Sequence, residues 1–485
     1  MINLIKNEFI KVFKKKNIYI CTIILALFVI LTNVLYTMMD KIIVEDYSFE
    51  ESYIDSAKEE LKTLNINQDK EYYISKKTDI DIYDLYKKYD KDSWQAYIVK
   101  KNMYNYVYNA NAYKYGLSVE NEYEQDNPEV ILNNQIEKLN KSDWKDYVKE
   151  NIEENNRQIV ELKNMLILDA DSKEKAGIES EIKRLELVNS LNQKRIDNNI
   201  PYGNNYINNA IDEYIQYSSD METDINQLNL TYSQKRNIQS YIETREKDKY
   251  IIETGKNVNN FNNAGFMLTN IFVEYGFFII IFIVMISGVI VSSEFEKGTI
   301  KMLLVKPYKR WKILLSKYIV SITMVIVGIF VVALMQLIVG GLFFGFDTLS
   351  TPIVVYDFGV NQLQTYNVFA YFGIMLLTKL PMFILIATLS FTASTLFSNS
   401  VLGIIIPIVC NIGGNIVNSL ASSFNIKQLM WFPTLNWDFS EYLFGKLPTY
   451  QYSNLGLSIA LSSIYLVSLC VIAFIAFNKK QVKNI

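Results

Sequence analysis

The sequence predicts an all-α membrane protein: six transmembrane helices, an N-terminal amphipathic helix and a mainly helical extracellular domain. Half of the 485 residues are apolar, and six apolar runs are long enough to cross the roughly 30 Å of a bilayer's hydrocarbon core. The charged residues are distributed unevenly along the chain. Residues 40–265 hold 30 Lys/Arg and 43 Asp/Glu, whereas the remaining residues hold 18 Lys/Arg and 8 Asp/Glu. One part is therefore polar and acidic, and the other is apolar with basic edges.

Residues 1–39 are expected to form an interface helix and the first transmembrane helix. Within residues 2–16 the apolar side chains recur at helical spacing and share one face, namely Ile2, Ile5, Phe9, Val12 and Phe13. The lysines lie mostly off that face, which predicts a helix in the headgroup region where basic side chains meet anionic lipid. Residues 18–39 then run for 22 residues without a charge. A cleaved signal peptide is the competing reading, but this run is long for one and no small-x-small cleavage site precedes Asp40.

Residues 40–265 are expected to form the extracellular domain, which is large enough to bury its own core. Residues 143–197 carry apolar side chains at helical spacing on both sides of a polar break at 168–171, which predicts a helical hairpin. The apolar positions of the two arms are Ile159, Leu162, Met165, Leu166, Ile178, Ile182, Leu185 and Leu191.

Residues 266–485 are expected to supply transmembrane helices two to six, at 268–291, 314–346, 369–397, 401–420 and 453–477. The fourth span contains Lys379 and Pro381, so we expect a kink or break there. Residues 421–452 carry many aromatic side chains and few charges, and we expect this loop to lie in the outer membrane interface, as a re-entrant or a flat helix.

Lys/Arg asymmetry predicts the orientation, because positive residues favour the cytoplasmic side. The N-terminal segment has five lysines, residues 292–317 have seven basic residues, and the 347–368 loop has none. With six spans, the N- and C-termini and residues 292–317 then share the cytoplasmic side, and residues 40–265 are extracellular. Abundant Asn, Ile, Lys and Tyr is typical of an AT-rich bacterial genome, so we expect a multi-pass protein of a bacterial plasma membrane.

Several chemistries are excluded by composition. The chain has no histidine, which removes Ser-His-Asp and Cys-His sites and the commonest metal ligand, and we expect no metal site. Its three cysteines all lie in apolar runs, and no phosphate-binding loop is present. We therefore expect no enzymatic activity and no cofactor in this chain. Nucleic-acid binding is also not expected, since the basic residues lie at membrane boundaries.

Residues 292–317, SSEFEKGTIKMLLVKPYKRWKILLSK, lie between two apolar spans and are the most informative stretch. A plain positively charged loop would explain the lysines but not the Gly-Thr start, the Leu-Leu pair or the Pro that follows. The stretch resembles the cytoplasmic coupling segment of ABC-2 type transporter permeases. That resemblance is carried by Glu294, Glu296, Gly298, Thr299, Leu303, Leu304, Pro307, Arg310 and Lys317.

The resemblance covers the N-terminal helix, the six spans and the aromatic loop, but not residues 40–265, where typical short members have a brief loop. It implies a permease subunit that acts as a homodimer or with a related second permease in the lipid bilayer. It also implies a separate ABC ATPase subunit that binds ATP and Mg²⁺ and pushes on residues 292–317, with the 2–16 helix alongside. The force-transmitting contacts expected from this are Glu294, Thr299, Leu303, Leu304 and Arg310.

The implied function is that of an ATP-driven exporter, with an amphipathic peptide, an antimicrobial or a lipid-like molecule as cargo. Two alternatives stay open. One is a mechanical transducer, whose outer domain drives a cell-wall enzyme or senses an extracellular ligand, and the other is a small-cation exporter.

Polar residues inside the predicted spans are candidates for a transport path. Glu274 and Lys379 are expected to form an ion pair, because an unpaired charge at such depth costs several kcal/mol. Asn411 and Asn415 flank Gly413 and Gly414 in the fifth span, where helix packing and a path lining are both open readings.

Overall fold

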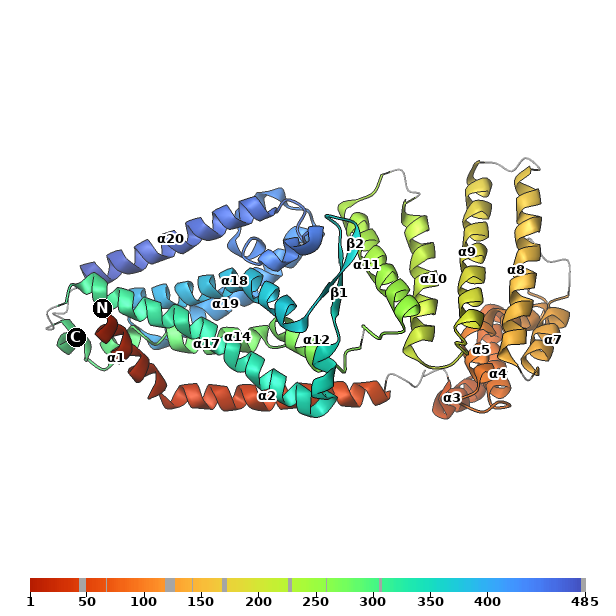
Figure 1. The fold of residues 1–485 in the computed structure, drawn as a ribbon, viewed down its shortest axis with the longest axis horizontal. Coiled ribbons are helices and arrows are strands. Elements are labelled where there is room, and N and C mark those ends of the chain that lie inside the picture. Colours follow the sequence, from red (N-terminus) through yellow and green to blue (C-terminus); the bar gives the residue numbers. More distant parts are fainter. Residues whose placement is uncertain are drawn as a thin grey trace. The chain divides into compact units, whose positions relative to one another are not determined.

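A computed structural model describes residues 1–42, 49–66, 68–117, 127–141, 143–167, 172–225, 229–258, 260–304 and 308–480. The chain forms two compact units, a membrane unit of Met1–Asp40 with Val258–Ile485 and a polar unit of Lys41–Asn257. Over the described ranges the two units are helical apart from a single two-stranded sheet (Figure 1). The fold class that the sequence predicts, an all-α membrane protein, is confirmed.

The membrane unit begins with α1 (Ile2–Phe13), a short helix followed at once by the long α2 (Lys16–Ile42). Among the described residues, five helices are long and apolar enough to cross a membrane, namely Lys16–Met38 within α2, α17 (Arg310–Phe344), α18 (Val368–Phe397), α19 (Ser400–Ser423) and α20 (Leu455–Lys479). Each follows a predicted apolar run closely, because the length of such a run is set by the thickness of the bilayer. Pro381 lies inside the continuous α18, so the break considered there does not occur.

The second predicted span, 268–291, is not a single helix. It consists of α12 (Ala264–Thr269), α13 (Ile271–Glu274) and α14 (Gly276–Ser287). Backbone hydrogen bonds continue across the junctions, since Glu274 N donates to Asn270 O at 3.0 Å and Ile279 N to Tyr275 O at 2.9 Å. Asn270 has a local reason to depart from helical torsions, because its side-chain amide also donates to Phe266 O at 3.1 Å. The apolar stretch is therefore helical throughout but irregular at two points.

The loop at 421–452, predicted to lie in the outer interface as a re-entrant or flat helix, is folded into the membrane unit. It contains three short 3₁₀ helices, η3 (Lys427–Trp431), η4 (Pro433–Leu435) and η5 (Phe439–Gly445). Trp437 is only 7% exposed and belongs to the core that the transmembrane helices share. Gly414 of α19 allows this approach, because a Cβ there would lie 2.3 Å from the Thr434 methyl group. Packing rather than a path lining thus explains this glycine.

The membrane unit also contains a β-hairpin that the sequence pattern did not predict. Strand β1 (Ile353–Asp357) pairs antiparallel with β2 (Gln362–Tyr366), and Ile353 lies opposite Tyr366. The turn includes Asn361 in a left-handed conformation, with φ of 54°. Phe358 N donates to Phe444 O at 2.8 Å, so the hairpin is tied to η5. Figure 1 shows both strands at the end of the membrane unit opposite to α1.

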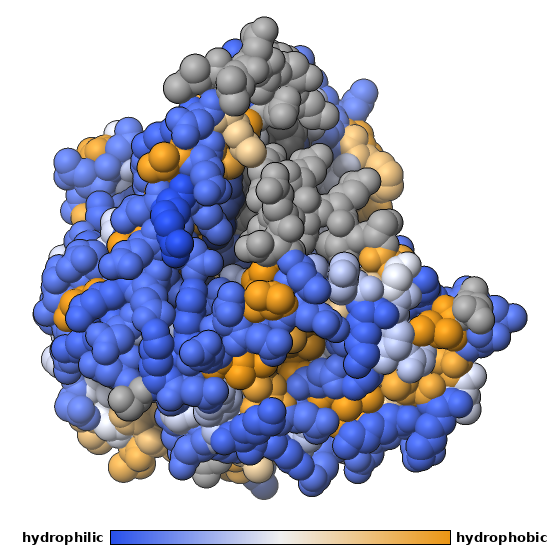
Figure 2. Space-filling model, turned by 90° about the vertical axis from the view of Figure 1, so that its right-hand side faces the viewer, coloured by the Kyte–Doolittle hydropathy of each residue, from blue (hydrophilic) through white to orange (hydrophobic). Residues whose placement is uncertain are grey.

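The polar unit is built from nine helices over its described ranges: α3 (Glu51–Thr63), α4 (Lys70–Tyr86), α5 (Trp94–Asn102), α6 (Tyr104–Lys114), α7 (Pro128–Leu139), α8 (Trp144–Ile167), α9 (Ser172–Asp197), α10 (Tyr206–Ile225) and α11 (Tyr232–Thr254). The predicted packing of 143–197 is confirmed, since Ile159 and Leu162 of α8 share a core cluster with Ile178, Ile182 and Leu185 of α9. The predicted break at 168–171 lies outside the described residues. The face seen in Figure 2 is mainly hydrophilic, as expected for a unit in water.

Candidate functional site

A buried cluster of four charged side chains joins α1 to α15 (Ser292–Glu296) and to the first turns of α17. Lys317 Nζ lies 2.6 Å from a Glu8 carboxylate oxygen and 3.3 Å from a Glu294 oxygen. Lys11 Nζ lies 2.6 Å from Glu294 and 3.2 Å from Glu8. Lys317, Glu8 and Glu294 are 0%, 4% and 7% exposed, whereas the Lys11 side chain is 43% exposed, so the cluster is buried except at Lys11. The two lysines face two carboxylates, which offsets the cost of burying the charges.

The electrostatics of the cluster favour its ionised form. Burial opposes ionisation of Glu294, but Lys317, Lys11 and a hydrogen bond from Thr299 outweigh it and lower its pKa to about 2. Burial lowers the pKa of the neighbouring Lys15 to about 8, and the positive charge of Lys317 acts in the same direction. The Glu294 carboxylate is therefore charged at every physiological pH, and it holds its two lysine partners throughout.

Residues 292–317 have a local structure that explains how Glu294 turns inward. After α15 the chain passes through Gly298, whose φ of 66° is in the left-handed region that glycine adopts without strain. Thr299 then donates its hydroxyl hydrogen to the Glu294 carboxylate, and α16 (Ile300–Leu304) follows. Leu303 and Leu304 end α16, but their side chains lie outside the described part of the chain, as does all of Pro307.

Two other residues named for the resemblance, Glu296 and Arg310, make contacts within the membrane unit. Glu296 accepts from the backbone N and the hydroxyl of Ser400 at 2.6 and 2.8 Å, at the N-terminus of α19. Arg310 Nη1 donates to the carbonyl oxygens of Asn478 and Lys480 at 3.1 and 3.0 Å, where α20 ends. The segment is thus fastened to α17, α19 and α20 by the residues that the sequence analysis singled out.

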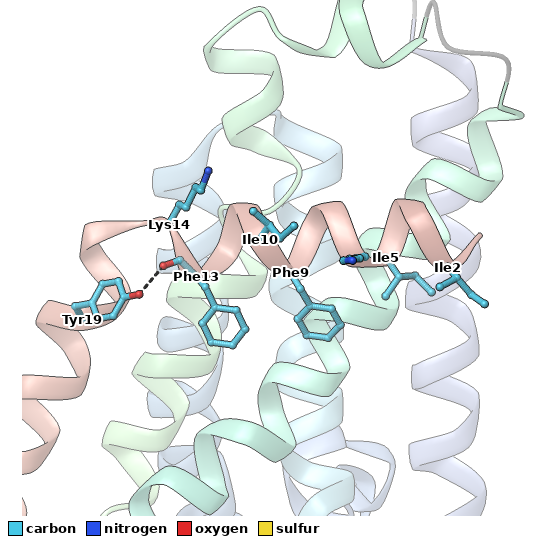
Figure 3. A pocket seen from close by; sticks show the side chains of 8 residues that line it. Ile2, Ile5, Phe9, Ile10, Phe13, Lys14 and Tyr19 are labelled. Atoms are coloured by element: carbon cyan, nitrogen blue, oxygen red, sulfur yellow. Dashed lines mark hydrogen bonds between the residues drawn. The ribbon is translucent and has the colours of Figure 1, made fainter.

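The predicted interface helix presents two different faces. Leu4, Glu8 and Val12 recur every four residues and face the protein, so the placement of Val12 on the lipid-facing side was wrong. Ile2, Ile5, Phe9 and Phe13 point to one side of α1, and with Tyr19 of α2 they line a hollow of about 700 Å³ (Figure 3). Ile2 and Phe13 are exposed there, whereas Ile5 and Phe9 also pack against the core.

The predicted Glu274–Lys379 ion pair is wrong. Lys379 Nζ of α18 lies 2.5 Å from a carboxylate oxygen of Asp438, in the loop after α19. Glu274 instead accepts a hydrogen bond from the Tyr36 hydroxyl of α2 at 2.7 Å. The physical reason is the fold of the 421–452 loop, which enters the membrane unit and brings its own carboxylate to Lys379.

The candidate path residues do not form one site. Asn411 is buried in α19, whereas Asn415, one turn further along the same helix, is exposed. Over the described part of the chain, neither side chain forms a hydrogen bond with Lys379 or Glu274. A lining common to these four residues is therefore not supported by the geometry.

Sequence reasoning missed a buried polar network between α2, α14 and α17. Asn33 and Gln336 exchange amide hydrogen bonds of 3.0 and 3.1 Å, and the Tyr275 hydroxyl donates to Gln336 at 2.7 Å. Thr32 lies 2.6 Å from the same hydroxyl. Asn33 and Gln336 are isolated amides inside long apolar runs, and this could have indicated the network, because polar groups in a membrane span need partners. Glu8 was missed too, although it is the sole acidic residue before Asp40.

These features define a multi-pass membrane protein with a buried charge cluster beside its first helix. The chain belongs to the family described as a protein of unknown function, DUF2705, whose profile matches residues 235–482, about half of the chain. It is 26% identical over 207 residues to the uncharacterized protein YhcI of Bacillus subtilis (strain 168), with 42% of this chain and 64% of YhcI covered. It is 27% identical over 203 residues to the uncharacterized membrane protein YdbK of the same organism, with 41% of this chain and 76% of YdbK covered. No solved structure matches the chain.

Proposed function

We propose that this chain is the permease subunit of an ATP-driven ABC exporter, with ATP and Mg²⁺ bound by a separate ATPase subunit. The observation that carries the proposal is the combination of the coupling pattern at 292–317 with the buried charge cluster. Glu294 and Lys317 belong to both, and they join the segment to α1 and α17. A push on the segment would therefore reach the membrane helices through short, charged contacts.

The structure supports a revised set of residues for contact with the ATPase. Glu294 and Thr299 bind each other inside the membrane unit and are unsuited to touch a partner. The side chains of Lys297, Lys301 and Met302 are exposed, and Met302 is 71% exposed although it is apolar. An exposed apolar side chain directly after an exposed lysine is suited to a protein contact with an acidic rim.

The arrangement of basic residues supports a cytoplasmic position for this end of the membrane unit. The charge cluster brings α1 to the start of α17, and Arg310 brings the end of α20 to the same place. The lysines of the N-terminus, the six described basic residues of 292–317 and Lys479 therefore lie at one end. By the positive-inside rule that end faces the cytoplasm, and residues 40–265 are extracellular.

Contact with lipid is supported by the hollow beside α1. Its apolar side chains from α1 lie next to Lys6 and Lys14, which is the pattern of a helix at a bilayer surface. In this proposal the subunit works as a homodimer or with a related permease, and the exported molecule is amphipathic.

A mechanical transducer is the second candidate. The observation that favours it is the polar unit, which has hydrophobic clusters of its own and is large enough to act on an extracellular partner. The two candidates share the ATPase and differ in whether a molecule crosses the membrane.

The test is co-expression with an ABC ATPase encoded beside this gene, followed by co-purification and measurement of ATP turnover. Met302→Asp should weaken co-purification and reduce the permease-dependent part of turnover at least severalfold. Val360→Asp is the matched control, because it places the same charge at an exposed apolar position in the β1–β2 turn. The proposal fails if no ATPase subunit binds, or if both variants behave alike. Uptake of a fluorescent amphipathic peptide into inverted vesicles then separates exporter from transducer.

A further inference from the structure

The polar unit contains a cavity of about 800 Å³ bounded by α5 to α10. This volume is typical of sites that take a ligand of drug or short-peptide size. Eight of the lining side chains are Asn or Gln amides, and the lining includes Tyr106, Tyr147 and Tyr202. Side-chain amides both donate and accept hydrogen bonds, as the peptide group does. The lining therefore matches a ligand that carries amide groups.

Arg195 of α9 lines this cavity although the residue is only 1% exposed. Its guanidinium carbon lies 4.2 Å from the centre of the Tyr202 ring, and Nη1 donates to the side-chain oxygen of Asn208. Asn208 is itself fixed, because its amide donates to the carbonyl oxygens of Pro201 and Gly203 at 3.0 and 2.9 Å. The guanidinium is thus held in place by Tyr202 and Asn208.

Over the described residues, Arg195 has no carboxylate within 4 Å. Arg184 lies 2.6 Å from Glu181, and Asp212, which acts on Arg195 only at longer range, accepts from the Tyr97 hydroxyl at 2.7 Å. Burial lowers the pKa of the Arg195 guanidinium, as it does for any cation removed from water. A buried cation without a paired anion is costly, and a bound carboxylate would satisfy it with a charge-assisted hydrogen bond.

We propose that this cavity binds a short peptide through its free C-terminal carboxylate, with Arg195 as the carboxylate's partner and the amide side chains as partners of the peptide groups. A singly charged carboxylate fits better than a phosphate dianion, because Asp212 also lines the cavity and repels additional negative charge. All the residues concerned belong to the polar unit, so the inference does not rest on the proposed transport function.

The test uses the full-length protein in lipid nanodiscs and isothermal titration calorimetry with trialanine, trialanine amide and inorganic phosphate. Trialanine should bind at least about tenfold more tightly than its amide, since a hydrogen bond between charged groups contributes about that much. Arg195→Gln should remove this difference. Because a buried arginine can also matter for folding, a second variant leaves Arg195 in place.

Asn192→Asp is that variant. Asn192 is buried in the cavity lining one helical turn before Arg195, so a carboxylate there can pair with Arg195 at i, i+3. This internal carboxylate should raise the thermal stability of the polar unit and lower trialanine affinity about tenfold or more. Asn198→Asp, exposed just after α9, is the matched control and should change neither quantity.

Equal binding of trialanine and its amide would overturn the proposal, as would the absence of saturable trialanine binding up to millimolar concentration. Phosphate binding as tight as trialanine binding would also overturn it, by making the cavity a general anion site. Loss of trialanine binding in Asn192→Asp together with a raised unfolding temperature supports it, because a merely misfolded variant would unfold earlier.

Discussion

Replacing Lys317 by methionine should destabilise the membrane unit by leaving two buried carboxylates with one cation. Lys317 Nζ is the partner of Glu8 at 2.6 Å and of Glu294 at 3.3 Å. Methionine has nearly the same shape and fills the same space, so the change removes charge rather than volume. Lys11 stays in contact with both carboxylates, at 3.2 and 2.6 Å, but it can neutralise only one.

The magnitude follows from these distances. At an effective dielectric constant of about 20, the two contacts of Lys317 attract by about 6 and about 5 kcal/mol. Most of this attraction offsets the cost of taking the charges out of water, and removal of one partner from a buried pair costs about 3–5 kcal/mol. Because Lys11 remains, we expect the lower end, about 3 kcal/mol. Adding Glu8→Gln restores neutrality and should recover at least about 1 kcal/mol of that loss.

Thermal unfolding with a thiol-reactive fluorescent dye measures this effect in the membrane unit alone, because Cys21, Cys410 and Cys470 all lie in it. Lys309→Met is the control, since Lys309 is exposed just before α17 and carries the same charge. The reasoning is refuted if Lys317→Met unfolds at the temperature of the control, or if the double variant is as unstable as the sum of its two single changes.

Three further outcomes are expected. Burial raises the pKa of Asp248 in α11 to about 7, which means that the folded state favours the neutral carboxyl group. The contribution of this group to the free energy of unfolding is therefore fully present below pH 4 and is lost as the pH rises through 7. Asp248→Asn should therefore stabilise the polar unit at pH 8 by at most about 4 kcal/mol and not at pH 4, and a pH-independent change in unfolding temperature would contradict this. Asp438→Asn leaves Lys379 without its carboxylate and should cost about 2–3 kcal/mol, most of which a second change, Lys379→Met, should restore in the same dye assay. Gly403→Ala would place a Cβ 2.4 Å from a backbone oxygen at the end of α14 and should lower stability by about 1–3 kcal/mol, whereas Gly413→Ala on the same helix meets no atom within 4 Å and should not.

The helices of the membrane unit could be predicted because bilayer thickness sets the length of an apolar run, and that length is visible in the sequence. The run at 369–397, for example, corresponds to α18 at Val368–Phe397. The packing of α8 on α9 could be predicted for a similar reason, since helical periodicity shows which side chains share a face.

Contacts between distant residues could not be predicted in this way. Lys379 and Asp438 are 59 positions apart, and Lys317 and Glu8 are 309 apart. A single sequence shows that a buried charge needs a partner, but several carboxylates can satisfy that need. The choice of Glu274 was wrong because the fold of the 421–452 loop decides which carboxylate arrives at Lys379.

The charge cluster also constrains how residues 292–317 could transmit a movement. Glu294 is fixed by Lys11, Lys317 and Thr299 together, so a displacement of α15 must either carry α1 and α17 with it or break contacts between buried charges. Breaking them costs about 3–5 kcal/mol, whereas moving an amphipathic helix along a fluid bilayer surface breaks no such contact. The lower-energy response is for α1, α15 and the start of α17 to move as one body. A crosslink between α1 and the start of α17 should therefore leave any ATP-driven activity unchanged, and loss of activity on crosslinking would show that the cluster opens.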